Sequence, residues 1–347
     1  MAVCSACGCA QAVIDATWQA EADEIYRKYQ IYHQSKGVEQ SVFDAATGAA
    51  TSRSSRLLRR VIAGAPVGEN GRLLDIGCGN GALLRAFSEL LPNWSLAGAE
   101  YNDHNRAVIE SIRGVEKLYT GSPTEIPGDF DIISLIHTLE HIPDPGAFIG
   151  TIWDKLKVGG LLLIQVPDCS QNPFMYLVAD HSSHFFPAIL KEIVAASGYE
   201  VLTVADDWVA KEITLIARKP GPKRLARPVG FGFDTAPSVG RSLDWLDTTV
   251  QLARSLADGP TFGLFGTSIA ATWLWAELEG RVGFFVDEDP HRAGQSLNGL
   301  PIYSPAKVPA GGRVMVALPS KLAAGVRERL GQLRDDVTYL APPPIAS

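Results

Sequence analysis

The sequence has little cysteine, no long apolar run and no excess of positive charge. Five cysteines among 347 residues are few and odd in number, which argues against a framework of disulfides. No apolar run approaches the ~18 residues of a membrane span. The 31 basic residues are outnumbered by 38 acidic ones, whereas a nucleic-acid-binding protein normally has a basic face. We therefore expect neither a membrane nor a nucleic acid as partner.

Residues 1–18 also lack the basic start and continuous apolar stretch of a signal peptide, so we predict a cytoplasmic protein. What the chain does have is apolar material. Hydrophobic residues make up 46% of it and charged residues 20%, which excludes global disorder. At ~150 residues per domain, the length predicts about two domains with room for a small extra module.

Short apolar runs alternate with helical patterns in the first two thirds of the chain. Four runs have the length and composition of buried strands: 72–76, 94–100, 130–136 and 160–166. Helical periodicity marks the segments between them: 81–91, 103–113 and 146–156. This alternation predicts a mostly parallel sheet with helices on both faces, and two apolar segments near 199–219 predict a closing pair of strands.

A second strand–helix series follows a segment rich in proline and glycine, which has no steady periodicity and is typical of a linker. The second series predicts a smaller Rossmann-like α/β unit, with helices near 241–257, 268–279 and 320–333. The predicted organisation has five parts: a cysteine-bearing segment 1–20, a helical segment 21–60, an α/β domain 61–218, the linker 219–240 and a second α/β domain 241–347.

A glycine-rich turn follows the first predicted strand. Asp75 is followed by Gly77, Gly79 and Gly81, and a helical pattern starts directly after them. Glycines permit positive φ angles and let a ligand approach the backbone. The next strand ends in Glu100, 21 residues after Gly79, where a carboxylate can accept both hydroxyls of a ribose. Strand, turn, helix and acidic residue together predict a site for a cofactor that carries a nucleoside.

Two cofactors fit this loop. Gly77, Gly79 and Ala82 satisfy the pattern G-x-G-x-x-A of dinucleotide-binding proteins, which would indicate a nicotinamide-dependent oxidoreductase. Asp75 favours another cofactor, because a carboxylate repels a pyrophosphate and attracts the ammonium of a methionine moiety. The string DIGCGNG resembles the cofactor loop of class I S-adenosylmethionine-dependent methyltransferases. The resemblance implies a Rossmann-like core with a mostly parallel seven-stranded sheet.

The resemblance also implies further contacts with S-adenosylmethionine. Glu100 would bind the ribose, and Tyr101 would pack on the adenine. Ile136 and His137, in the segment FDIISLIHTLEHIPDP, would line the cofactor near its sulfonium. Many relatives have an acidic residue that meets the adenine amino group. In this chain Ser122 occupies that region, and its hydroxyl would make the contact instead.

Methyl transfer is an in-line displacement that needs an aligned nucleophile and, for an alcohol or an acidic carbon, a general base. Histidine is the usual base near neutral pH. The segment DHSSHFF is similar to the Glu-His-x-x-Tyr-Phe segment of the sugar C-methyltransferases, where the acid–histidine pair takes part in proton abstraction. The similarity implies Asp180 and His181 as this pair, with His181 as base and His184 in place of the tyrosine. The alternative is a helix-capping Asp180 and a packing His181.

Two more histidines follow the strand 130–136. His137 and His141 flank Glu140, which could orient either ring. We expect His137 to lie near the cofactor. We expect His141 to stabilise a structural corner through bonds to backbone carbonyls.

Tyr26, Tyr29 and Tyr32 recur every three residues, which places them along one side of a helix. This helix would either act as a lid that closes over a substrate or pack on the core through its aromatic side.

The pattern Cys4-x-x-Cys7-x-Cys9 has one spacing that is typical of structural zinc sites. A closed tetrahedral site needs a fourth ligand, for which His33 is the nearest candidate in sequence. The sugar C-methyltransferases carry an N-terminal zinc module with two cysteine pairs, so the resemblance implies a shortened relative of it. The alternative is a segment with incidental thiols.

We therefore predict an S-adenosylmethionine-dependent methyltransferase whose acceptor is a small polar metabolite, as a monomer or homodimer. The layout of cysteines, methyltransferase core and Rossmann-like tail resembles the sugar C-methyltransferases, which implies a nucleotide-linked sugar or a related natural-product intermediate as acceptor. The alternatives are an O- or N-methyltransferase of a non-sugar molecule, a nicotinamide-dependent oxidoreductase and a non-catalytic scaffold.

Overall fold

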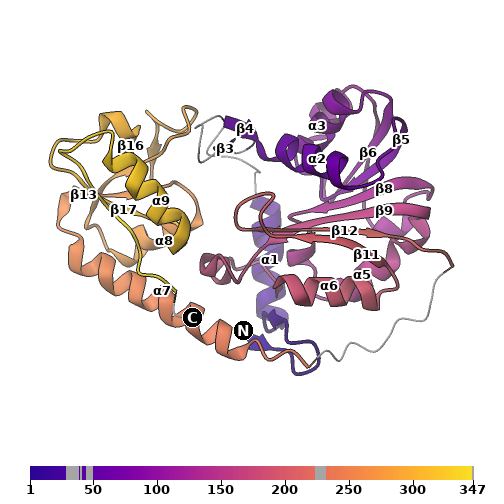
Figure 1. Ribbon diagram of the computed structural model, residues 1–347, viewed down its shortest axis with the longest axis horizontal. Helices are drawn as coiled ribbons and strands as arrows, with labels where there is room; N and C mark the ends of the chain where they lie inside the picture. Colours follow the sequence, from indigo (N-terminus) through magenta and orange to yellow (C-terminus); the bar gives the residue numbers. More distant parts are fainter. Residues whose placement is uncertain (29–38, 40, 44–49, 223–231, 346–347) are drawn as a thin grey trace. The chain divides into compact units, whose positions relative to one another are not determined.

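The structure is a computed structural model that describes residues 1–28, 39, 41–43, 50–222 and 232–345 (Figure 1). The chain divides into two compact units. The described residues of the first unit lie within Met1–Tyr32, Glu39–Cys169 and Ala179–Ala236, and those of the second lie within Ser170–Val178 and Pro237–Ser347. No described helix has the length and apolarity that crossing a membrane requires.

The first unit is built on a seven-stranded sheet with the order β11-β12-β9-β8-β5-β6-β7. Five strands run parallel, and β12 and β11 close the sheet in antiparallel fashion. The bounds are β5 (Gly71–Ile76), β6 (Trp94–Glu100), β7 (Val115–Thr120), β8 (Phe130–Ile136), β9 (Leu156–Pro167), β11 (Glu200–Ala205) and β12 (Glu212–Arg218). The predicted class, a Rossmann-like and mostly parallel sheet with a closing strand pair, is confirmed.

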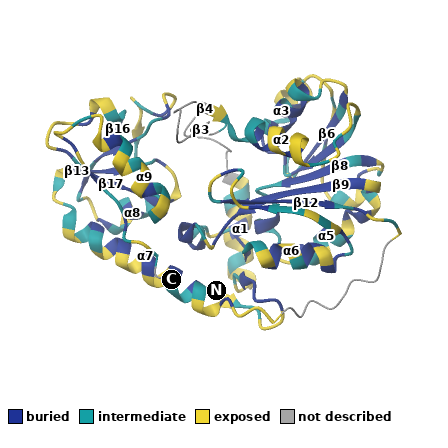
Figure 2. Cartoon of the chain, viewed as in Figure 1, coloured by how far each residue is buried: buried dark blue, intermediate teal, exposed yellow. Residues whose placement is uncertain are grey.

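Apolar layers cover both faces of this sheet. Leu73 belongs to one buried cluster and Leu74 to the other, because successive side chains of a strand point to opposite faces. Figure 2 shows the central strands β8 and β9 as buried. The covering helices are α2 (Arg53–Gly64), α3 (Ala82–Leu90), α4 (Arg106–Glu110), α5 (Pro145–Thr151) and α6 (Pro187–Ala196). The first three contribute to the cluster of Leu73, and the last two contribute to the cluster of Leu74.

Several element bounds differ from those expected. The edge strand β7 was not predicted, because Leu118 is its one buried residue and its pattern is mostly polar. The helix expected over 103–113 spans just Arg106–Glu110, since the chain turns at Gly114 with a φ of 85°. The helix expected over 146–156 ends at Thr151 and is followed by the 3-10 turn η4 (Trp153–Lys155).

The N-terminal segment forms a hairpin and a helix. β1 (Ala2–Val3) pairs with β2 (Ala10–Gln11), and β2 also pairs with β10 (Ser183–His184) in a three-stranded sheet. The helix α1 follows at Ala16–Lys28. Segment 21–60 is not continuously helical as expected, because β3 (Ser41–Phe43) and β4 (Ala50–Ser52) form a strand pair before α2.

The second unit has a six-stranded sheet with the order β15-β16-β14-β13-β17-β18. Its strands are β13 (Gly259–Phe265), β14 (Val282–Val286), β15 (Ser296–Leu297), β16 (Leu300–Tyr303), β17 (Arg313–Val316) and β18 (Thr338–Leu340). Its helices are α7 (Ala236–Leu256), α8 (Ile269–Glu277) and α9 (Ser320–Gly331). All strand pairs are parallel except β15–β16, as expected for a Rossmann-like unit. Helix α7 begins at Ala236, inside the segment predicted as linker.

Candidate active site

The glycine loop lies between β5 and α3, where the sheet ends. Gly77, Gly79 and Gly81 all have positive φ angles, of 75°, 57° and 83°. A Cβ atom on Gly77 would collide with the side chain of Thr138. Other residues adopt this left-handed conformation at a cost, so the loop requires glycine for both backbone geometry and space.

Glu100, at the end of β6, contacts this loop directly. One carboxylate oxygen accepts a hydrogen bond of 2.7 Å from the N–H of Gly79, and the other accepts one of 2.8 Å from the N–H of Tyr101. The Tyr101 side chain is 75% exposed. The two predicted nucleoside-binding residues therefore lie together next to the loop.

Asp75 does not face the crevice as expected. Its carboxylate is 2% exposed and accepts a hydrogen bond of 2.7 Å from the hydroxyl of Ser134 on the neighbouring strand β8. Burial raises the pKa of Asp75 to about 7, although the Ser134 hydrogen bond acts in the opposite direction. The expected direct attraction of an ammonium group is corrected to a role beneath the loop.

Ser122 begins the 3-10 turn η2 (Pro123–Glu125) and is exposed. Its hydroxyl caps this turn by accepting a hydrogen bond of 3.3 Å from the N–H of Thr124. Ser122 follows the end of β7, and Glu100 is at the end of the neighbouring strand β6. Both residues therefore lie at the carboxyl ends of the strands. The contact of Ser122 with an adenine stays a prediction.

His137 follows Ile136 at the end of β8 and links two carboxylates. Its Nδ1 lies 3.3 Å from Glu140 and its Nε2 lies 3.4 Å from Glu212. A φ of 52°, which is unusual for a residue other than glycine, turns His137 out of the strand. Arg53 lies 3.9 Å from the other oxygen of Glu212, so acidic and basic side chains alternate across this part of the site.

Glu212 escaped the sequence analysis, because a single acidic residue before an apolar strand carries no motif. It is the first residue of β12 and is paired with Pro167 at the end of β9, which brings it to the same edge as His137. Burial raises the pKa of Glu212, although the charges of His137 and Arg53 oppose this effect.

In the structure, Asp180 pairs with a different histidine from the one expected. The carboxylate of Asp180 lies 3.1 Å from Nδ1 of His141, and the Asp180 carbonyl lies 3.2 Å from the same nitrogen. The pair is therefore Asp180–His141, which corrects both the pairing with His181 and the purely backbone role expected for His141. Burial disfavours the charged ring, but Asp180 and Glu140 outweigh burial and raise the pKa of His141 to about 8.

His181 and His184 are buried next to this pair. The His181 ring centroid lies 4.9 Å from that of His141 and 6.1 Å from that of His184. Burial lowers the pKa of His181 to about 4 and that of His184 to about 3. Both rings are therefore neutral near pH 7, and a neutral ring can accept a proton. His184 lies in β10 and its carbonyl faces the thiol of Cys9.

Helix α1 places Tyr26 near both Tyr101 and His141. The ring centroid of Tyr26 lies 6.0 Å from that of Tyr101 and 6.1 Å from that of His141. Burial and the charge of Asp180 raise the pKa of Tyr26. The other two tyrosines of the predicted stripe, Tyr29 and Tyr32, lie outside the described residues.

The N-terminal cysteines lie in and beside the β1–β2 turn. The N–H of Cys4 donates a hydrogen bond of 2.9 Å to the carbonyl of Cys9. The thiol of Cys9 donates to the carbonyl of His184, with the sulfur 3.6 Å from the oxygen. Among the described residues, three potential metal-ligating atoms lie within 4.8 Å of one another in Glu140, His141 and His181 rather than in the cysteines. His33 lies outside the described residues.

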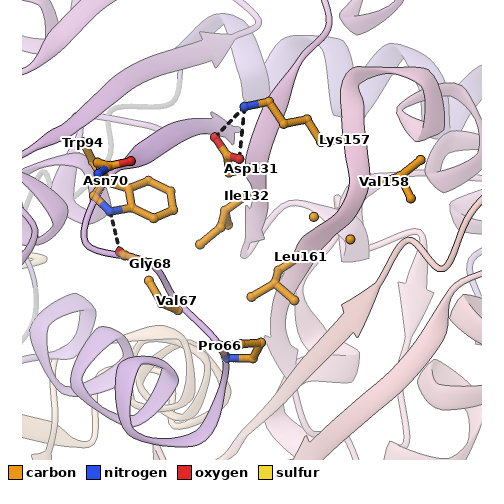
Figure 3. A pocket seen from close by; sticks show the side chains of 12 residues that line it. Pro66, Val67, Gly68, Asn70, Trp94, Asp131, Ile132, Lys157, Val158 and Leu161 are labelled. Carbon is orange, nitrogen blue, oxygen red and sulfur yellow. Dashed lines mark hydrogen bonds and ion pairs between the residues drawn. The ribbon is translucent and has the colours of Figure 1, made fainter.

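A surface pocket lies at the amino ends of the strands, opposite the glycine loop (Figure 3). It is lined by Trp94 at the start of β6 and by Asp131 and Lys157 near the starts of β8 and β9, which form an ion pair of 3.0 Å. The glycine loop follows the end of β5, so this pocket is not the cofactor crevice. Ligands of open α/β sheets bind outside the carboxyl ends of the strands.

The residues at the carboxyl ends fit S-adenosylmethionine. The loop offers exposed backbone at three positive-φ glycines, Glu100 can accept ribose hydroxyls, and Tyr101 presents an exposed ring to an adenine. Each carboxylate oxygen has a second lone pair, so Glu100 can accept ribose hydroxyls in addition to the N–H groups of Gly79 and Tyr101.

Comparisons with known proteins identify this unit. Residues 50–204 match the family model described as a methyltransferase domain. The ubiquinone biosynthesis O-methyltransferases of Pseudomonas putida and Azotobacter vinelandii are 31% and 32% identical over 116 and 118 residues, which are 31% of this chain and 48% of those proteins. The chain thus spans about half the length of the curated relatives it matches.

Solved structures with low sequence identity are also similar over part of the chain. An S-adenosylmethionine-dependent methyltransferase from Methanosarcina mazei has 17% identity and a TM-score of 0.37, and covers 44% of this chain and 94% of its own. Phosphoethanolamine N-methyltransferase 2 from Haemonchus contortus, in complex with S-adenosyl-L-methionine, has 17% identity and a TM-score of 0.41, and covers 49% and 53%. Residues 50–204 therefore match a methyltransferase domain, and the first unit has the seven-stranded, mostly parallel sheet of a Rossmann-like methyltransferase fold.

Proposed function

We propose that this protein transfers a methyl group from S-adenosylmethionine to a small polar metabolite. The observation that carries the proposal is that a glycine loop with its acidic partner and a cluster of buried histidines lie at one edge of one sheet. The loop follows β5, and His137 follows the adjacent strand β8. When bound, S-adenosylmethionine supplies an electrophilic methyl carbon, and the histidines lie where the acceptor end of the crevice is expected.

We assign the removal of the acceptor's proton to His181. Its ring is neutral near pH 7 because burial lowers its pKa to about 4. The structure changes one part of the expected arrangement, since Asp180 orients His141 instead of His181. His184 is 2% exposed and is held in a strand, so it supports the cluster from behind rather than touching the acceptor.

The acceptor class we propose is a nucleotide-linked sugar or a related natural-product intermediate. Its support is the resemblance of the Asp180–Phe186 segment to the sugar C-methyltransferases, together with a second Rossmann-like unit in the same chain. A second candidate is O-methylation of a hydroxyl on a non-sugar molecule. The observation in its favour is that the curated relatives are named O-methyltransferases.

We also propose that the cysteine segment holds a structural zinc ion through Cys4, Cys7 and Cys9. Its support is the spacing of the cysteines and the tight turn that brings the backbones of Cys4 and Cys9 into hydrogen-bond contact. Zinc binding would require the Cys9 thiol to turn away from the His184 carbonyl. Measuring zinc by native mass spectrometry, in the wild type and in the triple Cys→Ser variant, tests this site.

Methyl transfer is tested with purified protein and radiolabelled S-adenosylmethionine against matched acceptors: a nucleotide-linked keto sugar, its hydroxyl counterpart and a catechol. We expect label in one of the products and loss of turnover in His181→Ala, with cofactor affinity nearly unchanged. Thermal stabilisation by S-adenosylmethionine but not by NAD separates this function from an oxidoreductase. Stabilisation by NAD alone would refute the proposal.

A further inference from the structure

Glu140 lies among the three histidines at the acceptor end of the crevice. It belongs to the 3-10 turn η3 (Leu139–His141) directly after β8, and its side chain is 2% exposed. One carboxylate oxygen lies 3.3 Å from Nδ1 of His137. A carboxylate oxygen of Glu140 and one ring nitrogen each of His141 and His181 lie within 4.8 Å of one another.

The two acids near His181 have different partners. The carboxylate of Asp180 is taken by Nδ1 of His141, at 3.1 Å. Neither carboxylate oxygen of Glu140 has a hydrogen-bond partner among the described residues, although Oε1 lies 3.3 Å from Nδ1 of His137. Glu140 therefore retains acceptor capacity in the buried cluster that contains His181.

A buried imidazolium is costly unless a negative charge lies beside it. When His181 takes a proton, the titratable groups that face it are Glu140, His141, Asp180, His137 and His184. Asp180 is compensated by His141, which leaves Glu140 as the counter-charge. Burial opposes the ionisation of Glu140, but the hydrogen bond with His137 and the charges of the histidines hold its pKa at about 2.

We propose that Glu140 is the positioning residue of the site: it orients His137 and stabilises the imidazolium that forms on His181 during methyl transfer. This inference rests on the proposed function. The acceptor's proton passes to His181 while the bond from the acceptor atom to the methyl carbon forms and the carbon–sulfur bond breaks, leaving its electron pair on sulfur. Glu140 stays ionised throughout, and the imidazolium then releases its proton to solvent.

The central variant is Glu140→Gln, which keeps the shape of the side chain and removes its charge. We expect kcat to fall about 100-fold, the scale of general base catalysis, while the dissociation constant of S-adenosylmethionine stays within about twofold. Glu140→Asp keeps the charge and should retain at least about tenfold more activity than Glu140→Gln. Equal losses in both variants would overturn the proposal, because they would show that shape alone matters.

A matched control is Glu200→Gln on β11, an exposed carboxylate whose partner is Arg218 at 2.7 Å. It should leave kcat unchanged. A parallel loss of kcat in this control would overturn the assignment to Glu140.

A readout that needs no turnover is the titration of the His181 ring by nitrogen-15 NMR. The loss of the adjacent negative charge should move the protonation of His181 to lower pH in Glu140→Gln but not in Glu200→Gln. An unchanged titration would overturn the proposal. If the wild type methylates none of the acceptors, the proposed function fails, while this titration still decides the electrostatic role of Glu140.

The same three side chains, Glu140, His141 and His181, are also types that ligate divalent cations. Turnover is therefore measured before and after dialysis against a chelator. Unchanged activity supports the electrostatic role. Activity that is lost with the chelator and restored by Mn²⁺ or Zn²⁺ would overturn it and assign the cluster to a cation.

Discussion

The two α/β units have the same backbone arrangement after their first strands, but their acidic residues have different partners. The N–H of Gly77 donates to the carbonyl of Ala99 over 2.8 Å, and the N–H of Gly266 donates to the carbonyl of Val286 over 2.7 Å. In each case the acidic residue follows directly, as Glu100 in the first unit. In the second unit this position is Asp287.

Glu100 accepts from backbone N–H groups and keeps room for a ligand's hydroxyls, whereas Asp287 is occupied by its own chain. The carboxylate of Asp287 accepts a hydrogen bond of 2.6 Å from the hydroxyl of Thr267 and lies 3.6 Å from Arg292. The same strand–turn–helix geometry therefore has an acid next to the loop that we propose as the cofactor site in one unit, and an acid engaged in internal packing in the other. A glycine and an acid at the right distance do not by themselves make a site.

The largest contrast is expected from adding one methyl group to the first glycine of each loop. Gly77→Ala forces a Cβ into Thr138 at a positive φ, which should cost about 4 kcal/mol or more of the free energy of unfolding and abolish cofactor binding. Gly266→Ala also has a positive φ, but nothing lies within 4 Å of the added atom, so about 1 kcal/mol is expected. Chemical denaturation measures both, and equal losses would contradict the comparison.

A second contrast concerns the residue two positions before each glycine, which is Asp75 in the first unit and the fully buried Leu264 in the second. The folded-state pKa of Asp75 is about 7, against an ordinary value of 3.8. Its contribution to stability is therefore complete below about pH 4 and is lost as pH rises to about 7, a difference of roughly 4 kcal/mol at most.

The variant Asp75→Asn has no proton to lose. Relative to the wild type, its free energy of unfolding should therefore rise between pH 4 and pH 8. Denaturation of the wild type and of Asp75→Asn at several pH values checks this. Leu264, the equivalent residue of the second unit, is the same in both proteins. A difference between the two proteins that is constant with pH would show that Asp75 ionises normally.

Neutralising the acidic residue of each unit in turn tests the ligand-binding part of the comparison. Glu100→Gln should weaken the binding of S-adenosylmethionine by about 10-fold, since a hydrogen bond to a charged acceptor is lost. Asp287→Asn should leave that affinity unchanged and lower stability by about 1–2 kcal/mol, because Thr267 loses a charged acceptor and Arg292 loses one of its two acidic neighbours. Calorimetric titration measures the affinities. A loss of affinity in Asp287→Asn would contradict the assignment of the site to the first unit.

The smallest effect is expected at Tyr26, whose ring lies close to Tyr101. Tyr26→Ala should weaken cofactor binding by roughly two- to tenfold, because an aromatic pair contributes about 0.5–1.5 kcal/mol. Tyr26→Phe keeps the ring and serves as the matched control. If both variants bind like the wild type, α1 does not act as a cover for the crevice.

The sequence was sufficient to predict an element where the pattern lies within a single strand. The segments 94–100 and 130–136 were predicted with the bounds that the structure has, because they are continuous apolar runs buried on both faces. The contact between Glu100 and the glycine loop follows from the same reasoning, since adjacent parallel strands end at one edge.

Contacts between distant segments could not be predicted from spacing. Asp180 precedes His181 in the chain but pairs with His141, which lies 39 residues away in sequence. Asp180 lies in a turn that ends just before His181, so adjacency in the sequence does not make the two side chains point the same way. Glu212 shows the same limit, because its partner His137 comes from a different strand.

The hairpin at the start of the chain has a practical consequence for work on this protein. Ala10 is paired with His184 and Gln11 with Ser183, so the first dozen residues and the histidine-bearing segment form one hydrogen-bonded ladder. Affinity tags, truncations or alkylating reagents directed at this hairpin would act on a support of the acceptor end, although the two segments are more than 170 residues apart in sequence.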